Sequence, residues 1–203
     1  MKLTKNQLWL LVFNIILVLG FGYYYISSFN YEFVAYAVTI AVVIGMLYLT
    51  LPITRFPTVV IAGVTIWGLM HMLGGSVQTV DGVLYAFKIF PFFDGGGDFY
   101  ILKFDQVVHA YLYGVVGLMF WHLLTEVVGI KTHQIFIACV SIFAAAGFSI
   151  INEVIEFLAA VNLPETGVGG YHNTVLDLIF NLSGATIAVL CALWLRCRSQ
   201  IRK

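Results

Sequence analysis

Six ionisable side chains interrupt stretches of the sequence that are otherwise apolar, and their types suit metal or proton chemistry. A charged side chain at the centre of a bilayer costs about 2.5–3.5 kcal/mol, so such residues in a membrane helix indicate a partner or a function. Imidazole and carboxylate together are ligands of divalent metals, most simply zinc. The same groups could instead relay protons, bind a cationic ligand or hold helices together by hydrogen bonds. The six residues are His71, Asp105, His109, Glu153, Glu156 and Asp177.

Spacing places several polar residues on shared helical faces. Asp105, His109 and Tyr113 recur every four residues, which puts them on one stripe of a helix. Asp177 and Asn181 form a second stripe with the same spacing. Because Asp105 lies one turn before His109, it could bind a metal directly or fix the tautomer of the imidazole from outside the metal's ligand set.

A pair of carboxylates lies on another predicted helix. Glu153 and Glu156 are three residues apart and point to overlapping sides of one turn. Two carboxylates this close in a low dielectric resist joint ionisation unless a cation or a shared proton lies between them. We expect Glu156 to act as a general base toward a metal-bound water, with Glu153 and Asp177 as further catalytic groups. His172, just before the last predicted helix, is expected to support the site.

Composition requires that these residues lie in a membrane protein. The chain of 203 residues is 61% hydrophobic and only 10% charged, with a mean hydropathy of +0.97. Soluble domains carry about a quarter charged residues, so a water-facing fold could not bury this apolar surface. The formal net charge is zero, which excludes the basic surface of a nucleic-acid-binding protein.

Six apolar stretches are each about long enough to span a bilayer. They predict an all-α, polytopic bundle of about six transmembrane helices that forms a single membrane domain over residues 1–203. Residues 1–55 would supply two scaffold helices and residues 56–195 a four-helix core with a long loop at 74–103. Gly117 and Gly184 would let neighbouring backbones approach closely. The predicted spans are Gln7–Ile26, Phe33–Leu51, Pro57–Leu73, Phe104–Leu124, Gln134–Ala159 and Thr174–Leu195.

The distribution of lysine and arginine predicts the orientation. With the N-terminus in the cytoplasm, eight basic residues lie on the cytoplasmic side and two, Lys88 and Lys103, on the other. Cytoplasmic segments carry the excess of basic residues, so both termini are expected on the cytoplasmic side of the cytoplasmic (inner) membrane. Every ionisable residue named above then lies near the outer face, at a similar depth.

The long loop differs from an ordinary linker. Residues 85–93 are aromatic and too short to span a bilayer, and they are expected to lie at the headgroup level. Asp94 to Asp98 encloses three glycines and predicts a solvated turn, with calcium binding as the weaker alternative.

Three motifs on the last three predicted helices are typical of one group of membrane proteins. They are Asp105-x-x-x-His109-x-x-x-Tyr113-Gly114, Glu153-x-x-Glu156 and Asn173-Thr174-x-x-Asp177-x-x-x-Asn181-x-x-Gly184. The pattern resembles that of the VanZ-like membrane proteins over roughly residues 56–195. The preceding His71-Met-x-Gly-Gly is similar to their YjdF-like relatives, which are predicted inner-membrane proteins.

The resemblance implies a small helical bundle with a polar site, and it carries one informative departure. The VanZ-like pattern has Glu-x-x-Gln followed by an arginine before the last helix. Here Glu156 occupies the second position, and no arginine occurs between Glu156 and Asp177. The departure disfavours an anion site and favours a cation site.

Two functional hypotheses follow. In the first, the protein is a metal-assisted hydrolase or transferase at the outer leaflet, acting on a lipid or lipid-linked substrate. His71, His109 and one or more of Asp105, Glu153 and Asp177 would then bind the metal. In the second, the protein is not an enzyme, and the same groups bind a ligand or carry protons within a polar structural core.

Overall fold

The computed structural model describes residues 3–97, 99–163, 166–167 and 169–201. Asp98 and the terminal basic residues Lys2, Arg202 and Lys203 lie outside this range. Within the described residues, six helices are long and apolar enough to cross a membrane, which confirms the predicted fold class. These helices are α1 (Lys5–Ser27), α2 (Tyr31–Thr54), α3 (Thr58–Ser76), α4 (Phe104–His122), α5 (Gln134–Asn162) and α6 (Tyr171–Ile201).

Three helices start earlier than the apolar pattern indicates, and side-chain caps account for two of them. Thr4 and Gln7 form a reciprocal capping box at the start of α1. The Asn30 side chain accepts from the Phe33 amide at 3.2 Å, so α2 begins at Tyr31 rather than at Phe33. The last helix likewise begins at Tyr171, three residues before the predicted start. His172 therefore lies in the first turn of α6 instead of preceding it.

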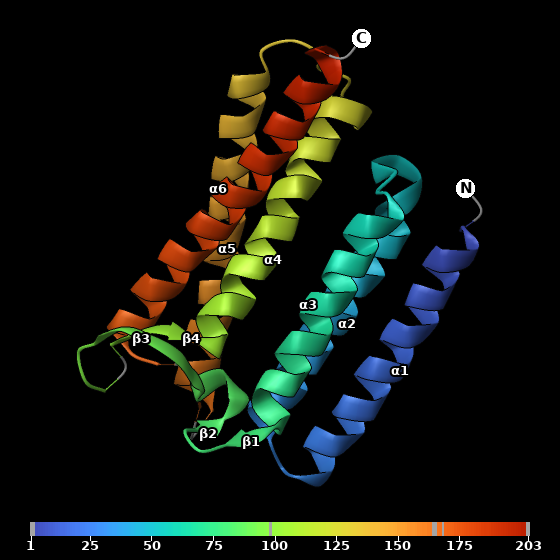
Figure 1. Cartoon of the computed structure of the whole chain (residues 1–203). Coiled ribbons are helices and arrows are strands. Elements are labelled where there is room, and N and C mark those ends of the chain that lie inside the picture. Colours follow the sequence, from blue (N-terminus) through green and yellow to red (C-terminus); the bar gives the residue numbers. More distant parts are fainter. Residues whose placement is uncertain (1–2, 98, 164–165, 168, 202–203) are drawn as a thin grey trace.

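The helices form two halves. Figure 1 shows α1, α2 and α3 on one side of the molecule and α4, α5 and α6 on the other, with both termini at one end of the bundle and the strands at the opposite end. Tyr25, Ile61 and Met72 belong to the core of the first half, and Val108 of α4 joins that core. The halves are therefore packed together through α4, which then continues through a π-helical turn at Leu123–Val127.

Close packing of α4 against α6 depends on glycine. A Cβ atom on Gly184 would collide with the backbone carbonyl of Ala110, and a Cβ on Gly117 would lie 3.0 Å from Cγ2 of Val189. The two helices can approach this closely only because these positions carry no side chain. The predicted role of both glycines is thus present in the structure.

The connection between α3 and α4 contains short strands that the sequence pattern did not indicate. Strands β1 (Gln78–Thr79) and β2 (Gly82–Val83) pair with each other, and a single 3-10 turn follows at Leu84–Ala86. Strand β3 (Lys88–Asp94) then pairs antiparallel with β4 (Tyr100–Lys103). Most of the aromatic stretch is therefore a hairpin strand, and its position at the headgroups stays a prediction.

Gln106 ties this hairpin to the start of α4. Its side-chain oxygen accepts from the amides of Leu102 and Lys103 at 2.7 and 3.1 Å, and its side-chain nitrogen donates to the Tyr100 carbonyl at 2.8 Å. The side chain is fully buried. These bonds fix the chain direction just before Asp105, where the candidate site begins.

Candidate metal centre

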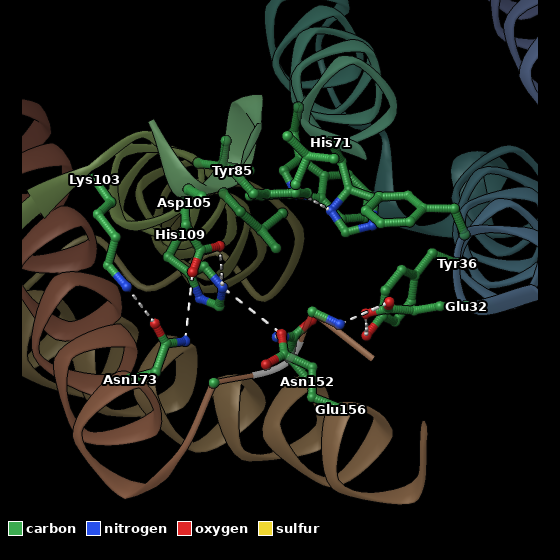
Figure 2. Close-up of a pocket in the computed structure, with 18 residues that line it drawn as sticks. Glu32, Tyr36, His71, Tyr85, Lys103, Asp105, His109, Asn152, Glu156 and Asn173 are labelled. Atoms are coloured by element: carbon green, nitrogen blue, oxygen red, sulfur yellow. Dashed lines mark hydrogen bonds and ion pairs between the residues drawn. The ribbon is translucent and has the colours of Figure 1, made fainter. Parts of the chain in front are cut away.

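A cavity of about 240 Å³ lies at the end of the bundle that carries the strands. Figure 2 shows His71 and Tyr85 on one side of it, and Asp105, His109 and Glu156 on another. The walls differ in chemistry, because one is largely aromatic and the other carries carboxylates and an imidazole. The aromatic wall contains Phe33, Tyr36, Trp67 and Tyr85, and the polar wall contains Lys103, Asp105, His109, Glu156 and Asn173.

His109 is central to the polar wall. Its Nε2 atom lies 3.5 Å from Oδ1 of Asp105 and 3.7 Å from Oε1 of Glu156. Its Nδ1 atom lies 3.1 Å from Oδ1 of Asn181. With the Asn181 amide in this orientation, its oxygen can only accept, which places a proton on Nδ1 of His109. Nε2 then faces two carboxylates, an arrangement that calls for a cation, either a proton on the ring or a metal ion.

Asp177 lies beside this group and is fully buried. Its Oδ2 atom accepts from the side-chain nitrogen of Asn173 at 2.6 Å, and the Asn173 oxygen accepts from Nζ of Lys103 at 3.1 Å. Oδ1 of Asp177 has no hydrogen-bond partner among the residues that the structure describes. Burying a carboxylate oxygen without a partner is costly, so Oδ1 is available to a cation, a proton or a water molecule.

The acidic and imidazole groups fall into two overlapping sets. In the first, one ligand atom from each of Asp105, His109 and Asp177 lies within 4.8 Å of the others. In the second, the same holds for Glu153, Glu156 and Asp177. Asp177 is common to both sets, and all five residues come from α4, α5 and α6. The three helices therefore bring together a ligand set of the kind that divalent metals use in helical bundles.

Comparison with known proteins places the chain in a family. A family described as "Predicted membrane protein (DUF2238)" matches residues 8–198. The chain belongs to this family. No curated protein and no solved structure matches it. The match reaches into all six helices of the DUF2238 protein, and it supports a membrane protein without naming an activity or a VanZ-like or YjdF-like relationship.

His71 of this DUF2238 protein lies at the predicted end of α3 but apart from both ligand sets. It faces the same cavity from α3, but neither ligand set of the described residues includes it. Its Nδ1 atom is hydrogen-bonded to the hydroxyl of Tyr85 (Figure 2). Burial, together with the negative charge of Asp105, raises the pKa of the Tyr85 hydroxyl further above its ordinary value, so the group stays protonated and can donate to His71. The pairing of His71 with His109 on one metal therefore stays a prediction, since neither ligand set of the described residues includes it.

The predicted supporting residues have separate locations. Asn181 contacts the site directly through His109. Tyr113 is buried one turn deeper in a cluster with Ala145 and Ala185, where it packs the three helices. His172 is exposed, and its ring stacks on Phe99 with the centroids 5.0 Å apart. Neither Tyr113 nor His172 belongs to the ligand sets of the described residues.

The sequence interpretation missed a contribution from α2. Glu32 and Tyr36 line the cavity, and the Tyr36 hydroxyl donates to Oε1 of Glu32 at 3.3 Å. Oε2 of Glu32 accepts from the backbone amide of Gly167 at 2.9 Å, which links α2 to the connection between α5 and α6. The Asn30 cap was the available signal, because a helix that begins at Tyr31 includes Glu32 as an ionisable residue at this end.

Proposed function

We propose that this DUF2238 protein is a metal-dependent membrane hydrolase or transferase whose first metal ion is bound by Asp105, His109 and Asp177. The observation that carries the proposal is the buried Oδ1 atom of Asp177. It has no partner among the described residues, yet it belongs to a carboxylate grouped with an imidazole and a second carboxylate. Zinc is the simplest ion for such ligands.

The separations within the group fit a metal better than a direct ion pair. Zinc binds nitrogen and oxygen at about 2.0–2.2 Å, so tetrahedral ligand atoms lie about 3.4 Å apart. Nε2 of His109 and Oδ1 of Asp105 are 3.5 Å apart. A hydrogen bond between imidazolium and carboxylate would bring them to about 2.7–2.9 Å. The two atoms thus have the spacing of neighbouring ligands on one ion.

The residues around the proposed metal suit a reaction on a molecule that enters the cavity at the strand-bearing end of the bundle. Glu156 lines the cavity, and its Oε1 is 3.7 Å from Nε2 of His109. The Glu156 carboxylate would therefore lie close to a water molecule held by the metal and could accept a proton from that water. Glu153 lies three residues before Glu156 and adds a further carboxylate. Lys103 on the wall and the apolar Trp67 opposite suit a polar headgroup joined to an apolar chain. A lipid or lipid-linked substrate matches this combination.

The proposal includes the orientation. With both termini in the cytoplasm, Lys5, Arg55 and Lys131 lie on the cytoplasmic side, as the positive-inside rule requires. The strand-bearing end, and with it the cavity, then faces away from the cytoplasm. The resemblance to VanZ-like and YjdF-like proteins agrees with an inner-membrane location.

Metal analysis of two matched histidine variants tests the function. The purified wild-type protein should retain stoichiometric metal after dialysis, as measured by elemental mass spectrometry. His109→Ala should lose it because a ligand is removed, whereas His71→Ala should retain it because His71 belongs to neither ligand set. Metal-free wild-type protein that binds no added Zn²⁺, or a His109→Ala variant that binds as well as wild type, would overturn the proposal.

If metal is bound, hydrolytic activity is the second readout. The wild-type protein, reconstituted in vesicles, should release product from fluorescent lipid esters or lipid phosphoesters, and Glu156→Gln should slow that release at least about tenfold while keeping the first ion. A metal-bound protein that cleaves neither substrate class would refute the enzymatic part and leave a metal-binding membrane protein.

A further inference from the structure

The second ligand set has no role in a centre with a single ion. Glu153, Glu156 and Asp177 each offer a ligand atom, and these atoms lie within 4.8 Å of one another. Oε1 of Glu153 is buried and, like Oδ1 of Asp177, has no hydrogen-bond partner in the described part of the chain. Two buried carboxylate oxygens, one on α5 and one on α6, therefore have no partner among the described residues, and the residues that carry them belong to one ligand set.

We propose that the centre holds two divalent ions bridged by Asp177, an inference that rests on the proposed metal-dependent function. Asp105 and His109 bind the first ion from α4, and Glu153 and Glu156 bind the second from α5. Asp177 supplies one carboxylate to both sets from α6. A carboxylate has two oxygens and can bind two ions at once, and two-metal sites hold their ions about 3.5–4 Å apart.

The negative charge of the site exceeds what a single divalent ion and Lys103 together neutralise. Asp105, Glu153, Glu156 and Asp177 carry four negative charges when ionised, and Lys103 supplies one positive charge nearby through Asn173. One divalent ion together with Lys103 would leave one of the four carboxylate charges uncompensated, whereas two divalent ions would neutralise all four carboxylates. Uncompensated charge inside a helix bundle is strongly unfavourable. The arithmetic holds without assigning any charge to His109.

Hydrogen bonds orient the ligands on both sides of the bridge. Asn173 donates to Oδ2 of Asp177 at 2.6 Å, which leaves Oδ1 directed elsewhere. Asn152 donates to Oε1 of Glu156 at 2.6 Å, so this carboxylate is also held in place. Outer partners of this kind fix the geometry of metal ligands. With a second ion present, Glu156 becomes a ligand, and the two ions acidify the attacking water in its place.

The cavity gives both ions access to a substrate. Asp105 and His109 of the first set and Glu156 of the second line it, so each ion would have an open side toward the same space (Figure 2). Asp177 is fully buried and is not among the described lining residues. The bridge therefore lies behind the ions, and the open positions lie in front of them.

Stoichiometry tests the inference separately from the proposed function. Full-length protein in detergent is stripped with a chelator and titrated with Zn²⁺ by calorimetry. Wild type should bind two equivalents and Glu153→Gln only one, with the first ion retained. His109→Ala should lose the first ion, and Asp177→Asn should weaken both by at least about tenfold. Glu126→Gln is the matched control, because this exposed carboxylate near the far end of α4 pairs with Lys131 and Arg196, and it should bind two equivalents.

Manganese provides an independent signature. Protein loaded with two equivalents of Mn²⁺ should give the electron paramagnetic resonance spectrum of an exchange-coupled pair, and Glu153→Gln should give that of an isolated ion. One equivalent in the wild type would overturn the two-ion centre and leave the proposed function standing, whereas none would overturn both. Two equivalents in Glu153→Gln would overturn the assignment of the second set.

Discussion

Gly184→Ala tests whether the contact of α4 with α6 positions the metal centre. The added Cβ would meet the carbonyl oxygen of Ala110, which is backbone and cannot rotate away. To restore an ordinary contact, the two helices must move apart by on the order of 1 Å, since well-packed interiors have no spare volume. Overpacking of this kind costs about 1–3 kcal/mol of stability.

The same movement reaches the site. His109 precedes Ala110 by one residue, and Asn181 precedes Gly184 by three, so their hydrogen bond spans the separating surfaces. It measures 3.1 Å, and a movement of about 1 Å takes it past the limit of a hydrogen bond. The imidazole then loses the partner that fixes its tautomer. Loss of such a partner weakens metal binding about 10–100-fold.

Two measurements and one control decide the outcome. Gly184→Ala should melt at a lower temperature in detergent and bind Zn²⁺ about 10–100-fold more weakly. Gly147→Ala in α5 is the control, because a Cβ there meets no atom within 4 Å, and it should leave both properties unchanged or raise stability slightly. Wild-type melting in Gly184→Ala would refute the packing argument. Lower melting with unchanged zinc affinity would refute the link from packing to the site.

Two further predictions concern the hairpin and the orientation. Gln106→Ala should lower the unfolding free energy by about 2–4 kcal/mol, since three hydrogen bonds to the backbone are lost at a fully buried position. Asn162→Ala, at an exposed position, is the control and should have little effect in the same melting assay. Val80 is 94% exposed, and Val80→Cys in a protein without its native cysteines should react with a membrane-impermeant maleimide in intact cells. Val128→Cys, near the opposite end of the bundle, should react only after lysis. The reverse labelling pattern would place the termini outside.

The sequence predicts well how deep each ionisable residue lies in the bilayer, because the bilayer thickness sets the helix length and successive helices alternate in direction. Asp105, Glu156 and Asp177 lie at the same end of the bundle for that reason alone, and the spacing of Asp105 and His109 puts both on one face. Depth does not determine the rotation of a helix about its axis. His71 has the predicted depth yet faces Tyr85, which comes from a loop whose path no periodicity reveals. Glu32 was missed for a simpler reason, because one capping residue moved the start of α2.

The locations of the carboxylates along their helices suggest which of them depends most on a bound cation. Asp105 lies in the first turn of α4, where the positive end of the helix dipole stabilises a negative charge. Asp177 accepts a hydrogen bond from the side-chain nitrogen of Asn173, and the side-chain oxygen of Asn173 accepts one from the Lys103 ammonium group. Glu153 lies in the second half of α5, away from the stabilising end of its helix, and its Oε1 is buried without a described partner. Glu153 thus has neither the helix end that stabilises Asp105 nor the lysine-linked hydrogen bonds that stabilise Asp177, and α5 is where the second ion of the proposed centre would bind.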